Sequence, residues 1–284
     1  PPPMVVMRRS APGPEKNRGP EWPFEAKMFL LKGPYEKCRP EEKPTFRAKI
    51  FKGRQMNAHS NLDSMIAEYM QLATTNVSDA LDRLRLDGAP QGIFPLWPGC
   101  RKIVGPAATM KLVPVGESSA SPVSGSLEAV MARRPGDVLV IDHGGNMEVN
   151  SYGGIVGFTT HHRKLSGCII DGVARDVDEY KELDLPVYAR GIVQQSIRNR
   201  CAFGGFGIEV QLGGVRVRPG DLVMADGNGV VVIPKENAEE ALTITKECKT
   251  TEERIVEAIR GGENPVDAHE KVRYDSMTSP PRPG

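Results

Sequence analysis

Helical patterns mark the two ends of the folded region. Apolar residues at positions 62, 65, 66, 69 and 72 recur at the spacing of one helix face. Residues 74–84 predict a second helix, with Thr75 or Asn76 as its N-cap. Near the other end, residues 234–262 predict a long helix that begins just after Pro234. Helices therefore flank the part of the chain that lies between them.

Between these helices, apolar runs alternate with short amphipathic segments. Such an alternation of strands and helices favours a layered α/β domain. Strands are predicted at residues 102–115, where Gly105 and Pro106 interrupt the run, at 137–142, 168–172 and 186–191, and as a series of short strands at 207–234. Helices are predicted at residues 126–134, 153–167 and 176–183.

One short motif occurs twice. Arg-Pro-Gly-Asp stands at residues 134–137 and again at 218–221, each time followed by an apolar strand that ends in an aspartate. Pro-Gly favours a tight turn, and the aspartate side chain is able to accept hydrogen bonds from the backbone of that turn. The repeat predicts two similar β-units rather than two active sites.

Composition limits the setting in which the chain works. The 284 residues carry 37 basic and 36 acidic side chains, so no general attraction to nucleic acid is expected. The five cysteines are far apart and form no CxxC pair, which is typical of a reducing compartment. No apolar run approaches the roughly 18 residues of a membrane span. We expect a cytoplasmic protein without a membrane or nucleic-acid partner.

The first 55 residues differ in composition from the remainder. Ten of the 24 prolines lie within the first fifty residues, among charges and scattered aromatic side chains. This composition predicts a proline-rich arm over residues 1–55 that packs on its own domain or on a neighbouring subunit, followed by a folded domain with a C-terminal helix over residues 56–284.

The main candidate for chemistry is Arg175-Asp176, directly after the predicted strand at 168–172. A guanidinium binds carboxylate or enolate oxygens with two donors, and a carboxylate is a hard ligand for Mg²⁺ or Mn²⁺. Neighbouring residues at a strand end are expected to point in different directions, which leaves both side chains free to bind. A surface ion pair, or an aspartate that caps the next helix, explains the spacing equally well; the position at a strand end favours function.

A second candidate is the glycine turn in "SYGGIVG", residues 151–157. Two glycines at the start of a helix leave unpaired N–H groups at its positive end, which favours an anion. The open amides belong to Gly154, Ile155 and Val156. A glycine turn is often only a turn, but beside Arg175-Asp176 it predicts a carboxylate site next to a metal site.

Several motifs together resemble the RraA-like family, which includes class II 4-hydroxy-4-methyl-2-oxoglutarate / 4-carboxy-4-hydroxy-2-oxoadipate aldolases. The resemblance covers about residues 62–234, and the strand-Asp-Gly-x-x-Arg-Asp motif is its most specific part. The motifs are "TTNVSDAL", "GPAATMKL", "RPGDVLVID", "YGGIVGFTTHHRKLSGCIIDGVARDVDEY", "LPVYARG" and "GGVRVRPGDLVMADGNGVVVIP".

The resemblance implies an α-β-β-α sandwich of the swivelling-domain type and a trimer or hexamer with active sites between subunits. It implies that Asp176 holds a divalent metal, Mg²⁺ or Mn²⁺, and that Arg175 binds the substrate. The implied substrate-binding set is completed by the glycine turn, namely Gly153, Gly154, Ile155 and Val156.

The implied reaction is cleavage of a small 2-oxo acid through a pyruvate enolate, by retro-aldol reaction or by decarboxylation of oxaloacetate. The chain departs from the family pattern at Gly154, where many aldolases carry an acid that helps to remove the 4-hydroxyl proton. This departure affects the aldol step more than the decarboxylation. His143 is a weak candidate for the missing base.

The competing hypothesis is a non-catalytic regulator of the RraA type, which binds a ribonuclease or another protein partner. Such regulators lack the aspartate that follows the arginine, whereas this chain keeps Asp176. The other polar residues nearby have plain structural interpretations. His161 and His162 are expected on a helix surface, and Asp178 and Glu179 suit the first turn of a helix, with a lesser possibility that they order the waters of the metal.

Overall fold

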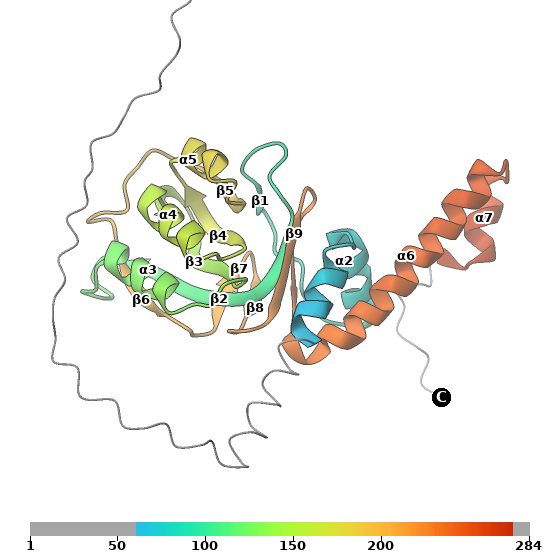
Figure 1. The fold of residues 1–284 in the computed structure, drawn as a ribbon, viewed down its shortest axis with the longest axis horizontal. Helices are drawn as coiled ribbons and strands as arrows, with labels where there is room; N and C mark the ends of the chain where they lie inside the picture. The colour runs from blue at the N-terminus through green and yellow to red at the C-terminus, as the bar shows by residue number, and fades with distance from the viewer. Residues whose placement is uncertain (1–60, 275–284) are drawn as a thin grey trace, which may run out of the picture. The chain divides into compact units, whose positions relative to one another are not determined.

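The computed structural model of the chain describes residues 61–274, of which 61–69 are helical. The predicted arm over residues 1–55, and its boundary with the domain at residue 56, lie outside the described residues. Within the described part, Figure 1 shows helices on both sides of a strand assembly. α3 (Pro122–Met131), α4 (Gly154–His162) and α5 (Val177–Glu182) lie on one side, and α2 (Thr74–Arg83) and α6 (Ala238–Arg260) lie on the other.

The strands form one eight-stranded sheet and a separate β-hairpin. The large sheet has the order β1-β5-β4-β3-β2-β9-β10, and β6 also pairs with β2. The strands β2, β3, β4 and β5 are parallel to one another, and β1, β6, β9 and β10 are antiparallel to their partners. Their bounds are β1 Phe94–Pro95, β2 Ile103–Pro114, β3 Val138–Tyr152, β4 Gly167–Ala174, β5 Val187–Ile192, β6 Cys201–Phe206, β9 Leu222–Asp226 and β10 Gly229–Ile233; the hairpin is β7 Val210–Leu212 with β8 Val215–Val217.

β2 connects the two halves of the large sheet. Its residues 103–106 pair with β9, and its residues 107–111 pair with β3. The strand is therefore continuous where the sequence predicted an interruption, and Gly105-Pro106 marks the point at which it changes partner. A side chain at Gly105 would overlap the carbonyl oxygen of Gly136, so the close approach of the next turn requires glycine there.

Three hydrophobic cores separate four layers. Along β3 successive side chains point to opposite faces: Leu139 and Ile141 belong to the core beneath α3–α5, and Val138 and Val140 belong to a core shared with β7–β10. The third core lies between β9–β10 and the helices α2 and α6. This is the α-β-β-α sandwich that the resemblance implied, and it explains why the central strands read as continuous apolar runs.

Both Arg-Pro-Gly-Asp motifs form the predicted turns. The Asp137 side chain accepts a hydrogen bond of 3.0 Å from the Arg134 amide, and the Asp221 side chain accepts one of 2.8 Å from the Arg218 amide. The turns lead into β3 and β9, which flank β2 on its two sides. The motif therefore begins two similar β-units, as predicted.

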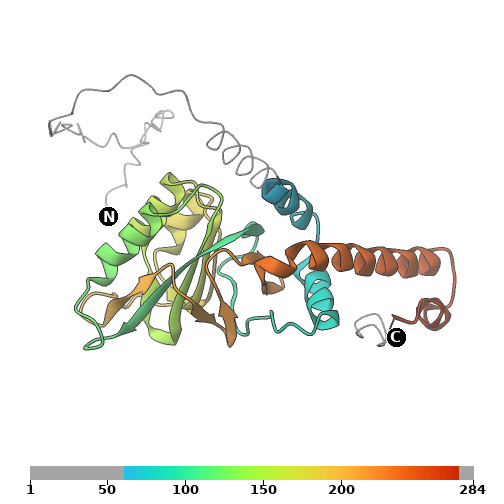
Figure 2. The same cartoon turned by 90° about the horizontal axis from the view of Figure 1, so that it is seen from below.

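The long closing helix is confirmed as α6, and a shorter helix that the sequence did not predict, α7 (Pro265–Lys271), follows it. Figure 2 shows α6 in orange beside α2, with α7 in red at its far end. Within residues 61–274, no helix combines the length and apolar character needed to cross a membrane.

The start of α2 differs from the prediction that Thr75 or Asn76 caps it. α2 begins at Thr74, and its own N-cap residue makes no side-chain hydrogen bond. Instead, the carboxylate of Asp226, the last residue of β9, accepts bonds of 2.9 Å from the Thr74 amide and 2.7 Å from the Thr74 hydroxyl. The cap comes from a residue 152 positions away, so local sequence does not reveal it.

Asp226→Asn is expected to lower the free energy of unfolding at pH 7 by about 1–3 kcal/mol, because hydrogen bonds to a charged acceptor are lost or weakened. Burial alone would raise the pKa of Asp226, but the hydrogen bonds from Thr74 and Asn228 outweigh it and hold that pKa below 3.8. The contribution of the Asp226 carboxylate to the free energy of unfolding is therefore present above the pKa of the unfolded chain. It is lost as the pH falls through the pKa of the folded chain. Urea denaturation at pH 7 and below pH 4 measures it.

The matched control for this prediction is Asp63→Asn, since Asp63 is exposed and forms no hydrogen bond or ion pair within the described residues. This variant is expected to match the original chain at both pH values. An Asp226→Asn chain as stable as the control at pH 7 would contradict the assigned cap.

Candidate active site

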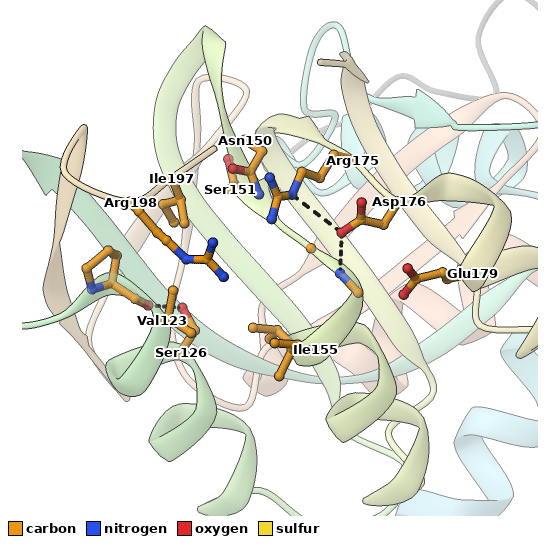
Figure 3. Close-up of a pocket in the computed structure, with 14 residues that line it drawn as sticks. Val123, Ser126, Asn150, Ser151, Ile155, Arg175, Asp176, Glu179, Ile197 and Arg198 are labelled. Carbon is orange, nitrogen blue, oxygen red and sulfur yellow. Dashed lines mark hydrogen bonds and ion pairs between the residues drawn. The ribbon is translucent and has the colours of Figure 1, made fainter. Parts of the chain in front are cut away.

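A cavity of about 140 Å³ opens where β3 and β4 end side by side. In the sheet Tyr152 of β3 pairs with Ala174 of β4, so the residues around these two ends lie at one edge. Figure 3 shows side chains from α3, β3, α4, α5 and the β5–β6 segment around the cavity. Its lining comprises Pro122, Val123, Ser126, Asn150, Ser151, Gly153, Gly154, Ile155, Val156, Arg175, Asp176, Glu179, Ile197 and Arg198. The structure thus brings together all of the residues that were predicted to bind the metal and the substrate.

The glycine turn is placed as predicted. Gly153 is the N-cap of α4 in an extended conformation, and the first helical bond runs from the Gly157 amide to the Gly153 carbonyl, at 2.9 Å. The Gly154 amide donates a 2.7 Å hydrogen bond to Asp176 Oδ2. Among the described residues no hydrogen bond uses the amides of Ile155 and Val156. Two of the three predicted amides are therefore open to a ligand, and the third is held by the site's own carboxylate.

Asp176 adopts an unusual backbone conformation. Its φ of 60° and ψ of 36° lie in the left-handed region, which is uncommon for residues other than glycine and is tolerated best by Asn and Asp. This conformation turns its carboxylate towards the start of α4. Left-handed residues cost about 1–3 kcal/mol and cluster at functional sites. The side chain is about one third exposed.

Arg175 and Asp176 do not point apart, contrary to our expectation. Arg175 Nε lies 3.4 Å from Asp176 Oδ2 (Figure 3), because the left-handed conformation of Asp176 brings its carboxylate back towards the arginine. The approach is an ion pair without a hydrogen bond, and the buried Nε has no hydrogen-bond partner. The backbone of Arg175 is held in place by a hydrogen bond of 3.1 Å from its amide to the Tyr152 carbonyl.

Asn150 is a member of the site that the sequence did not reveal. It is 2% exposed, lines the cavity, and its Oδ1 is buried without a hydrogen-bond partner. Leaving a buried acceptor unpaired costs about 1–3 kcal/mol. Such an atom, in a cavity that also holds Arg175 and Asp176, indicates that a ligand completes the site.

The donor atoms of the site suit a hard cation. Asp176 and Glu179 line the cavity with carboxylate oxygens and Asn150 has an amide oxygen without a partner, and hard oxygen ligands favour Mg²⁺ or Mn²⁺ over zinc. Within residues 61–274 no group of three or more His, Cys, Asp and Glu side chains could hold a metal. Mg²⁺ is usually bound through one or two carboxylates and keeps several waters, and two carboxylates line this cavity.

Arg198 and Ser126 also line the cavity, and neither belongs to a motif that would identify it in the sequence. Arg198 lies in the segment between β5 and β6, and Figure 3 shows its guanidinium directed into the cavity from the side opposite Glu179. A ligand with a second anionic group would meet this cation. A lone arginine outside regular elements gives no pattern to detect.

His143 does not line the cavity. It is buried within β3, and its Nδ1 lies 2.8 Å from the hydroxyl of Ser151, which does line it. Burial lowers the pKa of His143, although Asp142 and Asp171 act in the opposite direction. The side chain instead borders a separate pocket with Lys111 and Arg200. His161 and His162 are exposed in the last turn of α4, as expected.

A family model described as RraA-like, Aldolase/RraA, matches residues 74–232, and the chain belongs to this family. A protein of Halalkalibacterium halodurans named "Putative 4-hydroxy-4-methyl-2-oxoglutarate aldolase" is 32% identical over 212 residues, which cover 74% of this chain and 96% of that protein. DlpA of Legionella pneumophila is 29% identical over 75% of this chain, but the match spans only 34% of DlpA.

Solved structures share the fold. An uncharacterized protein from Pseudomonas syringae pv. tomato superposes with a TM-score of 0.68 and 32% identity, over 74% of this chain and 94% of that one. Streptomyces coelicolor RraAS2, described as an unusual member of the RNase ES inhibitor RraA protein family, superposes with a TM-score of 0.60 and 25% identity, over 67% and 94%. Thus relatives named as aldolases and relatives named as regulators both resemble the chain.

Proposed function

We propose that the protein is a divalent-metal-dependent lyase that cleaves a small 2-oxo acid through a pyruvate enolate. The observation that carries this proposal is the convergence of three features on one cavity: the Asp176 carboxylate, the Arg175 guanidinium and the open amides at the start of α4. The unpaired Oδ1 of Asn150 supports a ligand at the same place.

The chain's own groups suit the two ends of a 2-oxo acid. The free amides of Ile155 and Val156, at the positive end of a nine-residue helix, suit the carboxylate. Arg175 suits the oxygen at C2, which gains negative charge as the enolate forms; a donor that meets developing charge stabilises the transition state more than the ground state.

Asp176 would hold the cation, with Glu179 and Asn150 as the other oxygen donors nearby. When bound, a divalent cation draws electron density from the 2-oxo group and so favours the enolate. Asp176 is held ready for this role by the Gly154 amide and by the adjacent guanidinium.

Two reactions share this enolate. Retro-aldol cleavage of a 4-hydroxy-2-oxo acid, such as 4-hydroxy-4-methyl-2-oxoglutarate, releases pyruvate and a carbonyl compound, and decarboxylation of oxaloacetate releases pyruvate and CO₂. The family's aldolase names support the first reaction. Both substrates carry a second carboxylate, and Arg198 is the cation that faces the cavity opposite Glu179.

A regulator that binds a protein partner is the alternative function, supported by the likeness to RraAS2. A binding role alone gives no reason for a left-handed Asp176 beside an unpaired buried oxygen. We also propose a trimer or hexamer with sites between subunits and a cytoplasmic location. Two exposed apolar side chains on α4, Ile155 and Phe158, support such an interface, and Ile155 also lines the cavity.

Pyruvate release from oxaloacetate and from 4-hydroxy-4-methyl-2-oxoglutarate tests the proposal. With Mg²⁺ present, we expect turnover of at least one substrate well above the rate in protein-free buffer that contains the same Mg²⁺. After treatment with EDTA we expect that excess to disappear and to return when Mg²⁺ or Mn²⁺ is added. An oligomeric, folded protein that releases pyruvate from neither substrate would count against the lyase and favour the binding role.

A further inference from the structure

Retro-aldol cleavage needs a group that the proposed function has not yet supplied. The 4-hydroxyl proton must be removed as the C3–C4 bond breaks, whereas decarboxylation needs no such base. The cavity lining contains no His, Cys, Lys or Tyr, and its only carboxylates are Asp176 and Glu179. Asp176 is engaged by the Gly154 amide and the Arg175 guanidinium. Elimination among the described lining residues therefore leaves Glu179.

The position of Glu179 agrees with that role. It lies in the first turn of α5, and its carboxylate faces the start of α4 (Figure 3). A Cβ built on Gly154 would come 2.7 Å from Glu179 Cδ, so the carboxylate occupies the space that any side chain at residue 154 would need. Among the described residues the Glu179 carboxylate takes part in no hydrogen bond or ion pair. It is therefore free to accept a proton, and its exposure lets solvent remove that proton again.

The helix dipole of α5 does not account for this placement. An acid in the first turn of a helix is favoured wherever its side chain points. Asp178 satisfies the same preference, yet its side chain is 92% exposed, pairs with Lys181 at 2.9 Å and lies outside the cavity. Only Glu179 of this pair is directed to the site, and Asp178 provides a matched control on the same turn.

We propose that Glu179 is the general base of retro-aldol cleavage, an inference that rests on the proposed lyase function. The Glu179 carboxylate takes the proton of the 4-hydroxyl, and the C4–O bond becomes a carbonyl as the C3–C4 bond breaks. The electron pair of that bond forms the C2–C3 double bond, and the 2-oxo oxygen becomes the enolate oxygen beside Arg175. Protonation at C3 then gives pyruvate, so the proton removed is balanced by the proton added.

Glu179→Gln tests this role, because it keeps the size of the side chain and removes its basicity. We expect the retro-aldol kcat to fall by about 10²–10⁴-fold, the usual contribution of a general base, and to fall far more than the rate of oxaloacetate decarboxylation. Asp178→Asn is expected to leave both rates near those of the original protein. Equal losses in the two reactions, or a retro-aldol rate that does not fall, would overturn the assignment.

A double variant provides an independent test by moving the carboxylate. Gly154→Asp alone places a side chain against Glu179, but Glu179→Ala combined with Gly154→Asp puts a new carboxylate into the vacated space. We expect the double variant to recover at least about tenfold over Glu179→Ala in retro-aldol cleavage. No recovery in a folded double variant would show that a carboxylate at this place does not act as the base.

The failure of this inference is distinguishable from the failure of the proposed function. If the unaltered protein decarboxylates oxaloacetate but does not cleave the 4-hydroxy acid, the metal-dependent enolate chemistry stands and the assigned base is wrong. If it does neither, the proposed lyase itself is wrong. Mn²⁺ binding by Glu179→Gln, followed by electron paramagnetic resonance, gives a readout independent of turnover and is expected to persist.

Discussion

Asp176→Ala is expected to reduce pyruvate release by about 10³-fold or more at saturating Mg²⁺, the largest effect of any single substitution in the chain. In the proposed reaction a bound cation would supply several kcal/mol of charge stabilisation to the developing enolate, and Asp176 is the carboxylate that we propose holds it. Mn²⁺ binding, followed by electron paramagnetic resonance, is expected to weaken in parallel.

Asp176→Asn separates the loss of charge from a change in the backbone. Asn tolerates the left-handed conformation of residue 176 nearly as well as Asp, whereas Ala does not. We therefore expect the Asn variant to unfold at nearly the original temperature and still to lose most of its turnover. If Asp176→Asn kept Mg²⁺-dependent turnover within a few-fold of the original, the cation would have to be held elsewhere.

Arg175→Lys is expected to lower kcat by about 10²–10³-fold, although the charge is retained. In the proposed reaction the planar guanidinium would present a fixed fork of donors to the enolate oxygen, and the single ammonium of lysine does not reproduce that geometry. Because the contact strengthens as charge develops, kcat is expected to change more than KM. Steady-state kinetics on whichever substrate is turned over measures both constants.

Arg101→Lys is a matched control for Arg175→Lys. Arg101 is exposed, pairs with Asp184 at 2.6 Å and lies outside the cavity. Its substitution is expected to leave both constants unchanged. An Arg175→Lys variant with a kcat close to that of the control would mean that Arg175 does not touch the reacting oxygen.

The layered α/β fold was predictable because its signals are local. Apolar runs at residues 137–142 and 168–172 became β3 and β4, and the glycine turn opened α4 where predicted. The elements that escaped prediction depend on distant partners. The cap of α2 is supplied by Asp226, and the change of partner along β2 follows from the course of the strand between the two halves of the sheet.

The candidate site was predictable in its motif but not in its geometry. Arg175-Asp176 stands out in the sequence because it follows the end of an apolar strand, and the glycine turn stands out because two glycines precede a helical pattern. Their contact depends on the left-handed backbone of Asp176, which the residue type permits but does not dictate. In the sequence Glu179 was interpreted first as an acid that favours the start of a helix, and second as a residue that orders the waters of the metal. Its place against Gly154 follows from the packing of α5 beside α4, which no local pattern encodes.

Exchange of the methyl protons of pyruvate for deuterium tests the enolate most directly, because it does not depend on which C4 substituent the natural substrate carries. In D₂O with Mg²⁺, proton NMR is expected to show the loss of the C3 methyl signal at a rate well above that in buffer with the ion alone. EDTA and Asp176→Ala are each expected to abolish the excess. Exchange no faster than in protein-free Mg²⁺ buffer would contradict a metal-dependent pyruvate enolate at this site.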